Sequence, residues 1–365
     1  MTVALVTGLP AFRAKRVCES LLVDADTSVR AVVSPKYMQD ARNLVDAMPA
    51  GARERVELLE GDTSSIDLGL SGHELARLGD DVEVIHHAAQ VTYLNADRAV
   101  AAQANVAGTR EVLEVAALCR RLRCVVVHSQ TSVSGAFEGV FREADLDVGQ
   151  THRNAVEETL ARAEHMARAA MASLPVAVVR ASVIVGDSHT GEIDRFDGPY
   201  HLMLLMLTSP ADFAVPLPGR GDLALNLVPV DFVANAAVAI GRDPRAPGRT
   251  FHLVDSAALP ARRVFELFAN AAGRRSPRGS VPASLASALL RAPGLERFAA
   301  SPRSLIDSLV TSIRYDTRNA DLVLGPLGLR CPPFASYVDT LAAYVQTRLR
   351  ERRRVSDSPP AAGAT

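Results

Sequence analysis

Short apolar runs alternate along this chain with longer stretches in which apolar residues recur at helical spacing. Several runs, such as Val125-Val126-Val127 and Val176-Ala177-Val178-Val179, contain no polar residue. Continuous apolar runs are typical of parallel strands that are buried on both faces. The pattern predicts strands at residues 3–7, 28–34, 56–60, 82–87, 123–128, 176–180 and 251–254, with helices between them, notably over 96–121 and 152–173.

This alternation predicts an α/β fold, a doubly wound Rossmann-type parallel sheet with helices on both faces and a smaller substrate-binding lid region. We expect a core over residues 1–188, a lid segment over 189–224, a return to the core sheet over 225–260 and a C-terminal helical substrate region over 261–350. The irregular stretch 186–225 and the helical stretch 280–312 are both assigned to the lid, over the carboxyl ends of the strands. The polar, proline-containing tail 351–365 is predicted to be disordered.

Composition narrows the class of protein. The formal net charge of the 365 residues is −1, so there is no basic excess for a nucleic-acid partner. No apolar run approaches the ~20 residues that span a bilayer, and no charged segment precedes the first run as in a signal peptide. The four cysteines, Cys18, Cys119, Cys124 and Cys331, show no C-x-x-C spacing, which favours reduced thiols. We therefore expect a soluble cytoplasmic protein, a monomer or homodimer, with neither nucleic acid nor membrane as a partner.

Two simple kinds of chemistry are disfavoured by spacing. His86 and His87 are adjacent in a predicted strand, so their side chains should point to opposite faces and cannot chelate one metal ion. The chain has no G-x-S-x-G sequence, the nucleophile elbow of an esterase. No metal site is predicted.

The loop after the first predicted strand has the features of a phosphate-binding turn. It reads Thr7-Gly8-Leu9-Pro10-Ala11-Phe12-Arg13-Ala14 and leads directly into a helical stretch. Such a turn brings backbone N–H groups at the helix N-terminus to the diphosphate of a dinucleotide. Arg13, Lys15 and Arg16 add cations in the first turns, where they oppose the helix dipole, and an anionic ligand would account for them.

The end of the second predicted strand indicates which dinucleotide is bound. Val33-Ser34-Pro35-Lys36 contains no acidic residue to accept a ribose 2′-hydroxyl, as NAD-binding proteins usually provide. Ser34 and Lys36, together with Arg13, suit a 2′-phosphate better. NADPH is therefore favoured over NADH as the cofactor.

These features resemble the extended short-chain dehydrogenases/reductases of the thioester-reductase and fatty-acyl-reductase type. That family shows T-G-x-x-G-F-x-G at the first loop, matched here by Gly8 and Phe12, with Ala11 and Ala14 in place of the second and third glycines. Similar matches are Gly61-Asp62-Thr63, His86-His87-Ala88-Ala89, Asn105-Val106-Ala107-Gly108-Thr109 and the segment from Arg180 to Ser188. The resemblance implies a dinucleotide site formed by Gly8, Pro10, Ala11, Phe12, Arg13, Ser34, Lys36, Asp62, Thr63, Ala88, Ala89, Ala181 and Val183.

The residues that carry catalysis in this family are missing. The family's active-site helix reads Y-x-x-[ST]-K-x-x-A-E-x-L, and residues 156–166 follow it at Thr159, Ala163 and Glu164. The tyrosine position is Val156, however, and the lysine position is Leu160. The Ser/Thr that lies five residues before a glycine falls on Gln130, counted back from Gly135. In this the chain resembles a small group of polyketide ketoreductases, the angucyclinone reductases among them, that lack the triad.

Two functions remain compatible with the sequence. The first is an NADPH-dependent ketoreductase for an aromatic polyketide, in which a phenol of the substrate supplies the proton and Val156 and Leu160 make the pocket apolar. The second is a non-catalytic NAD(P)-binding protein, such as a redox sensor or scaffold, which also explains the lost triad. For a ketoreductase, the candidate pocket residues are Tyr93, Ser129, Gln130, Ser132, Tyr200 and His201.

Overall fold

The structure, a computed structural model, describes residues 1–93, 96–210, 212–219, 221–282 and 312–357. The chain divides into two compact units. The first contains Met1–Ile184, Val230–Ser256 and Ser312–Cys331, and the second contains the described parts of Val185–Pro229, Ala257–Thr311 and Pro332–Thr365. Residues 312–331, which we expected in a C-terminal substrate region, thus belong to the first unit.

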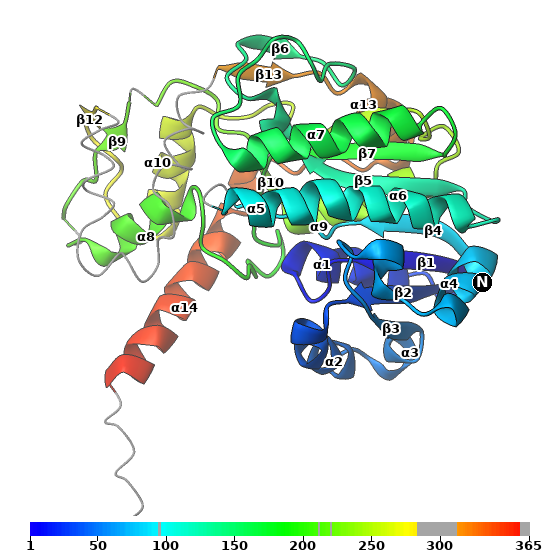
Figure 1. Cartoon of the computed structure of the whole chain (residues 1–365). Helices are drawn as coiled ribbons and strands as arrows, with labels where there is room; N and C mark the ends of the chain where they lie inside the picture. Colours follow the sequence, from blue (N-terminus) through cyan, green and yellow to red (C-terminus); the bar gives the residue numbers. More distant parts are fainter. Residues whose placement is uncertain (94–95, 211, 220, 283–311, 358–365) are drawn as a thin grey trace, which may run out of the picture. The chain divides into compact units, whose positions relative to one another are not determined.

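A seven-stranded sheet organises the first unit (Figure 1). Every neighbouring pair of its strands is parallel. Its order is β11-β7-β5-β4-β1-β2-β3, so the direction of winding reverses between β1 and β4, where doubly wound folds bind their ligands. The strands are β1 Thr2–Thr7, β2 Thr27–Val33, β3 Val56–Glu60, β4 Val82–His87, β5 Cys124–Gln130, β7 Val176–Ala181 and β11 Thr250–Leu253. All seven predicted strands and the doubly wound fold are confirmed.

Helices fill the intervals between the strands of this sheet. The predicted helix over 96–121 is confirmed as α5, a π-helical segment and α6 in succession, and the one over 152–173 as α7. Asn154 begins α7 by accepting hydrogen bonds from the N–H groups of Val156 and Glu157. The elements are α1 Phe12–Leu22, η1 Pro35–Tyr37, α2 Met38–Asp46, α3 Ala50–Arg53, η2 Ile66–Gly69, α4 Gly72–Asp81, α5 Arg98–Ala101, η3 Ala102–Ala107, α6 Gly108–Leu118, η4 Thr131–Ser134, α7 Ala155–Ala170, α9 Val230–Arg242, α13 Arg318–Leu324 and η5 Gly325–Leu327.

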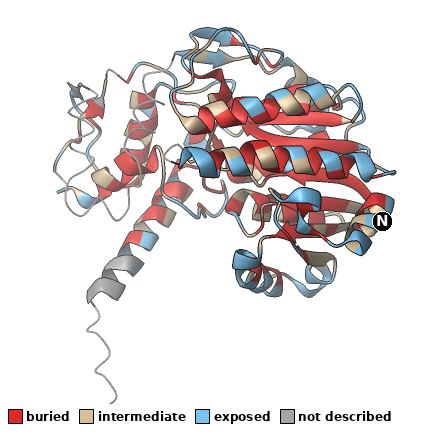
Figure 2. Cartoon of the chain, in the orientation of Figure 1, coloured by how far each residue is buried: buried red, intermediate tan, exposed pale blue. Residues whose placement is uncertain are grey.

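Alternation along the strands gives the sheet an apolar core on each face. Leu5 packs with residues of α4, α6 and α7, whereas its neighbours Ala4 and Val6 pack with α1 and α9. Successive side chains of a strand point to opposite faces, so one apolar run supplies both cores. The strands are accordingly buried throughout the sheet's centre (Figure 2).

A small additional sheet joins the C-terminal part of the first unit to the core. Its two strands, β6 Gly139–Phe141 and β13 Ile313–Tyr315, pair in parallel. The carboxylate of Glu143, only 2% exposed, accepts hydrogen bonds from the N–H groups of His252 (2.9 Å), Asn319 (2.6 Å) and Ala320 (3.1 Å). One buried side chain thereby links β11 to the start of α13, which explains why residues 312–331 belong to this unit.

An E143Q variant is expected to lose about 1–3 kcal/mol of stability, because its amide nitrogen would face an N–H group that needs an acceptor. Burial raises the pKa of Glu143 from 4.5 to about 7, despite the three N–H donors. The folded state therefore holds a proton that the unfolded chain releases, and this contribution to stability is lost as the pH rises from 4.5 to about 7. Urea denaturation at a series of pH values should show this pH-dependent part of the unfolding free energy in the wild type and not in E143Q. An identical pH dependence in both proteins would contradict the assignment.

The described part of the second unit contains short strands and three longer helices. Its described elements are β9 Leu217–Pro218, β10 Leu227–Pro229, β12 Ser280–Val281, α8 Tyr200–Thr208, α10 Ala261–Ala271, η6 Phe334–Ser336 and α14 Val338–Asp357, and β8 Val183–Val185 spans the division between the units. The apolar stretch 202–207 lies on α8, and all of it except Leu205 is buried. This stretch is therefore part of the apolar core.

The last helix extends beyond our expectation. α14 continues past Glu351, where the tail was predicted to begin, to Asp357. Glutamate and arginine are good helix formers, and Arg348 pairs with Glu351 one turn later at 3.0 Å. The rest of the predicted tail, 358–365, and most of the predicted helical stretch 280–312 lie outside the described residues.

Candidate dinucleotide-binding and catalytic site

The turn after β1 requires glycine at Gly8. Its φ of 101° lies in the left-handed region, and a Cβ there would come within 2.9 Å of the N and Cα atoms of Ala89. The N–H of Ala11 closes the turn by donating to the carbonyl of Gly8 at 2.9 Å. The chain after β4, at Ala88 and Ala89, therefore lies directly against the turn.

The N-terminus of α1 is open to an acceptor from outside the described chain. Its N-cap, the exposed Ala11, makes no side-chain capping bond, so the first N–H groups of the helix, at Phe12, Arg13 and Ala14, are left without an intrahelical acceptor. A phosphate satisfies such donors well. The adjacent Pro10 is partly exposed. The turn and helix start thus fit a dinucleotide diphosphate even though Ala11 and Ala14 replace two glycines.

A chain of buried hydrogen bonds fixes the end of β4. Thr7 Oγ1 lies 2.9 Å from His87 Nδ1 and accepts a bond from the N–H of Ala89, while His87 Nε2 lies 3.2 Å from Thr109 Oγ1. On the opposite face of the sheet, His86 Nδ1 lies 3.2 Å from His128 Nε2. Burial lowers the pKa of both His86 and His87 to about 3, so both are neutral. The prediction that these neighbours point to opposite faces is confirmed.

The residues assigned to the adenosine half of the cofactor lie near the surface. Ser34 is partly exposed, and Lys36 is exposed with its Nζ 4.6 Å from the centre of the Tyr37 ring. Asp62 is exposed, and its Oδ1 accepts bonds from the N–H (2.9 Å) and hydroxyl (2.7 Å) of Ser64. Thr63 is partly exposed beside Gly108 of α6. Their cofactor-binding roles stay predictions.

The tyrosine and lysine positions of the active-site helix are sealed in an apolar cluster. Val156 and Leu160 are 0% and 1% exposed and pack in a cluster with Val133, Phe141 and Leu146. We expected them to line an open apolar pocket, and they offer no exposed surface. Their methyl groups fill the core between α7 and the chain after β5, where a phenol or an ammonium group would need polar partners.

Of the three candidates at the end of β5 and directly after it, one is held in a buried hydrogen bond and two are partly exposed. Ser129 is buried and donates to Glu164 Oε2 at 3.1 Å, so it does not line a pocket as we expected. Gln130 and Ser132 are partly exposed, and the Ser132 hydroxyl donates to Gln130 Oε1 at 3.4 Å. This contact leaves the amide nitrogen of Gln130 without a partner among the described residues.

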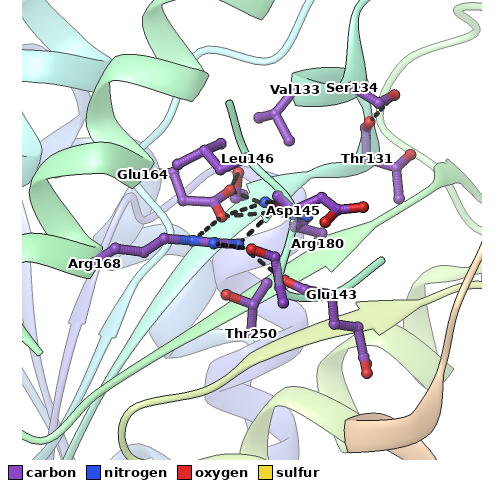
Figure 3. A network of polar contacts seen from close by, with 12 residues as sticks. Thr131, Val133, Ser134, Glu143, Asp145, Leu146, Glu164, Arg168, Arg180 and Thr250 are labelled. Carbon is purple, nitrogen blue, oxygen red and sulfur yellow. Dashed lines mark hydrogen bonds and ion pairs between the residues drawn. The ribbon is translucent and has the colours of Figure 1, made fainter. Parts of the chain in front are cut away.

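A buried ion-pair network was missed by the sequence analysis (Figure 3). Arg180, 0% exposed, contacts both carboxylate oxygens of Glu164, at 2.6 Å for the shortest pair, and donates to the carbonyl of Asp145. Arg168 pairs with the same carboxylate at 2.9 Å. On the other side, Arg180 Nη1 lies 3.1 Å from His252 Nε2, and His252 Nδ1 lies 2.7 Å from the carbonyl of Asp316.

A signal for this network exists in the sequence. Arg180 is the penultimate residue of β7, whose other residues are apolar, and Glu164 lies on the buried face of α7. A charge within a buried pattern needs an opposite charge nearby. Because Ser129 of β5 and Arg180 of β7 are aligned across the sheet, the network holds the strand end from which Gln130 extends.

The remaining candidates are dispersed. Tyr93 is partly exposed after β4, and its carbonyl accepts from the N–H of Ala96. Ala181 is buried at the end of β7 and Val183 is partly exposed. Tyr200 and His201 belong to the second unit and are 1% and 2% exposed there. The Tyr200 hydroxyl accepts the N–H of Gly186 at 2.8 Å, so this phenol is already engaged within that unit.

Two absences hold for the described part of the chain. It contains no group of three or more His, Cys, Asp or Glu side chains that could hold a metal ion. None of its helices is both long enough and apolar enough to cross a membrane.

The fold and the turn after β1 define an NAD(P)-binding protein of the doubly wound class. Residues 6–237 match the model of the NAD-binding family described as male sterility protein, and the chain belongs to this family. Among curated proteins, it is 28% identical over 235 residues to glycine betaine reductase of Emericella nidulans, covering 62% of this chain and 18% of that protein. It is 30% identical over 207 residues to carboxylic acid reductase of Segniliparus rugosus, covering 52% and 17%. The chain thus spans less than a fifth of either relative's length. Family membership agrees with the predicted class, an NAD(P)H-dependent oxidoreductase.

Similar folds occur in reductase domains of biosynthetic assembly lines. The terminal R domain from the myxalamid PKS-NRPS pathway superposes with a TM-score of 0.80 at 21% identity, covering 96% of this chain and 92% of that one. The reductase domain of a nonribosomal peptide synthetase from Mycobacterium tuberculosis gives 0.71 at 20% identity, covering 96% and 92%. At these identities the likeness concerns the fold.

Proposed function

We propose that this protein is an NADPH-dependent ketoreductase that reduces a carbonyl of an aromatic polyketide, with the proton supplied by the substrate. One observation carries the proposal. The positions of the family's tyrosine and lysine are buried as Val156 and Leu160 in an apolar cluster, while the dinucleotide turn keeps its glycine and its open helix start. The chain retains the parts that bind a hydride donor and lacks the usual acid.

Reduction without a protein acid is energetically reasonable. When bound, NADPH supplies the hydride, and the protein has to hold the carbonyl in register with it. Such positioning can contribute about 7–11 kcal/mol, whereas a general acid typically contributes about 10²–10⁴-fold in rate. Positioning can therefore carry most of the catalysis.

The proton balance requires a neighbouring phenol. Hydride adds to the carbonyl carbon, the electron pair of the C=O π bond moves to oxygen, and the phenolic O–H gives its proton to that oxygen. Water then returns a proton to the phenolate. Gln130 supports this scheme because it is partly exposed and its amide nitrogen, which has no partner among the described residues, can donate a hydrogen bond to the substrate carbonyl.

The comparisons support the class of reaction. Carboxylic acid reductase is named for the reduction of a carboxylic acid, and glycine betaine reductase is likewise named as a reductase. A ketone of a polyketide is a related electrophile. Ser34 and Lys36 support NADPH over NADH, and a monomer or homodimer in the cytoplasm remains our expectation.

The proposal is tested by following NADPH oxidation at 340 nm with a panel of aromatic polyketide ketones, half of which carry a phenol beside the carbonyl. We expect turnover at least about 10²-fold faster for that half, the contribution of a well-placed acid. Equal turnover of ketones with and without the phenol would overturn substrate assistance.

The same experiment tests the second function. A protein that binds NADPH by calorimetry and turns over no ketone would be a non-catalytic NAD(P)-binding protein. The buried Val156 and Leu160 are the observation in favour of that alternative, because they leave the active-site helix without a proton donor at either position.

A further inference from the structure

The first turns of α1 carry three cations with different surroundings. Lys15 and Arg16 lie over the ring of Phe12, at 5.9 and 5.3 Å from its centre, and both pair with Glu19. The first turn of the helix contains no acidic residue. Among the described residues, the guanidinium of Arg13 lies over no aromatic ring and pairs with no carboxylate.

Arg13 is a partly buried charge without a counter-ion in the described chain. Its guanidinium donates one hydrogen bond, from Nη2 to the carbonyl of Ala88 at 3.2 Å, and no carboxylate of the described residues pairs with it. Burial lowers the pKa of Arg13 to about 10, so it stays charged at neutral pH. The nearby His87 and His128 are neutral, because burial lowers their pKa values also. A buried cation at a helix N-terminus is unfavourable unless an anion joins it.

The position of Arg13 separates it from the other phosphate candidates. Ala88 follows β4, which neighbours β1 on one side, whereas Ser34 and Lys36 follow β2, which neighbours β1 on the other. In doubly wound folds the diphosphate lies at the end of the first strand, with the adenosine half beyond it on the side of the second strand. Arg13 therefore lies on the side away from the 2′-phosphate candidates.

We propose that Arg13 binds the cofactor's diphosphate, and that the 2′-phosphate is left to Ser34 and Lys36. This rests on the proposed binding of NADPH. A guanidinium can donate two parallel bonds to phosphate oxygens. Together with the N–H groups at the start of α1, it replaces the close backbone approach that the second glycine of the resembled motif would allow.

The test measures binding, with R13M compared with the wild type by calorimetry for NADPH, NADH and ADP-ribose. All three ligands carry the diphosphate and only NADPH carries the 2′-phosphate. R13M should weaken all three by about 10–100-fold, the loss of hydrogen bonds to a charged group, with the NADPH/NADH affinity ratio unchanged. K36A should weaken NADPH alone. R13K, which keeps the charge, should recover part of the loss.

Two control measurements separate binding of the diphosphate by Arg13 from a purely structural role of this side chain. K15M removes a cation from the same helix, but one that is paired with Glu19, and should leave the three affinities within about twofold. Without ligand, R13M should melt no lower than the wild type, because it removes an uncompensated buried charge.

Four results would count against the assignment. Loss of affinity for NADPH alone in R13M would move Arg13 to the 2′-phosphate, and unchanged affinity for all three ligands would remove it from the site. A lower melting temperature of free R13M, with R13K equally weak in binding, would make it structural. Failure of the wild type to bind any of the ligands would refute the proposed function itself, and the inference with it.

Discussion

An R180M variant is expected to unfold with a free energy about 3–5 kcal/mol below that of the wild type, the usual cost of removing one partner of a buried ion pair. Arg180 is 0% exposed and connects Glu164, the carbonyl of Asp145 and His252. Its removal leaves the fully buried carboxylate of Glu164 with only Arg168 and Ser129. Because typical domains have a stability of about 5–15 kcal/mol, the loss is easily measured by urea denaturation.

Two further variants make the origin of this loss clear. The double variant E164L/R180M removes both buried charges and should recover a large part of the stability, since apolar replacement of a whole pair is often neutral. R120M removes an exposed arginine that pairs with Asp80 on the surface and should change little. If R180M were as stable as R120M, the buried ion-pair network would not hold α7, β5 and β7 together.

An L160K variant restores the lysine of the family's active-site helix and is expected to destabilise the protein by about 4 kcal/mol at pH 7. The side chain at this position is 1% exposed within an apolar cluster. Burial of that kind lowers the pKa of a lysine by about 3–5 units, at about 1.4 kcal/mol per unit. Since the unfolded chain gains the proton below its ordinary pKa of about 10.4, the penalty should shrink to about 1 kcal/mol at pH 10.

Denaturation of L160K at pH 7 and pH 10 checks this prediction. L160M, of similar volume and without charge, should lose less than about 1.5 kcal/mol and show no such pH dependence. An L160K protein as stable as L160M at pH 7 would mean that the position opens to water. In that case the absence of the family's lysine would not follow from packing.

Local patterns were sufficient for the sheet and for the dinucleotide turn. Seven apolar runs became the seven strands because each had to be buried on both faces. Gly8 was identified from the sequence alone because only glycine takes a φ of 101° so close to Ala89. The roles of Ser129 and Arg13 depend on residues far away in the chain, Glu164 and Ala88, and no local pattern contains those pairs.

The sequence by itself determined the class of fold, the glycine turn after the first strand and the loss of Tyr and Lys from the active-site helix. These depend on residue type and on spacing within one element. The tertiary structure decided that Val156 and Leu160 are core residues and that Ser129 donates a hydrogen bond to the buried carboxylate of Glu164. It also decided that residues 312–331 belong to the first unit, where the carboxylate of Glu143 accepts hydrogen bonds from α13. The physical reason is that burial and charge compensation are properties of several elements packed together, and they are fixed only when distant segments meet.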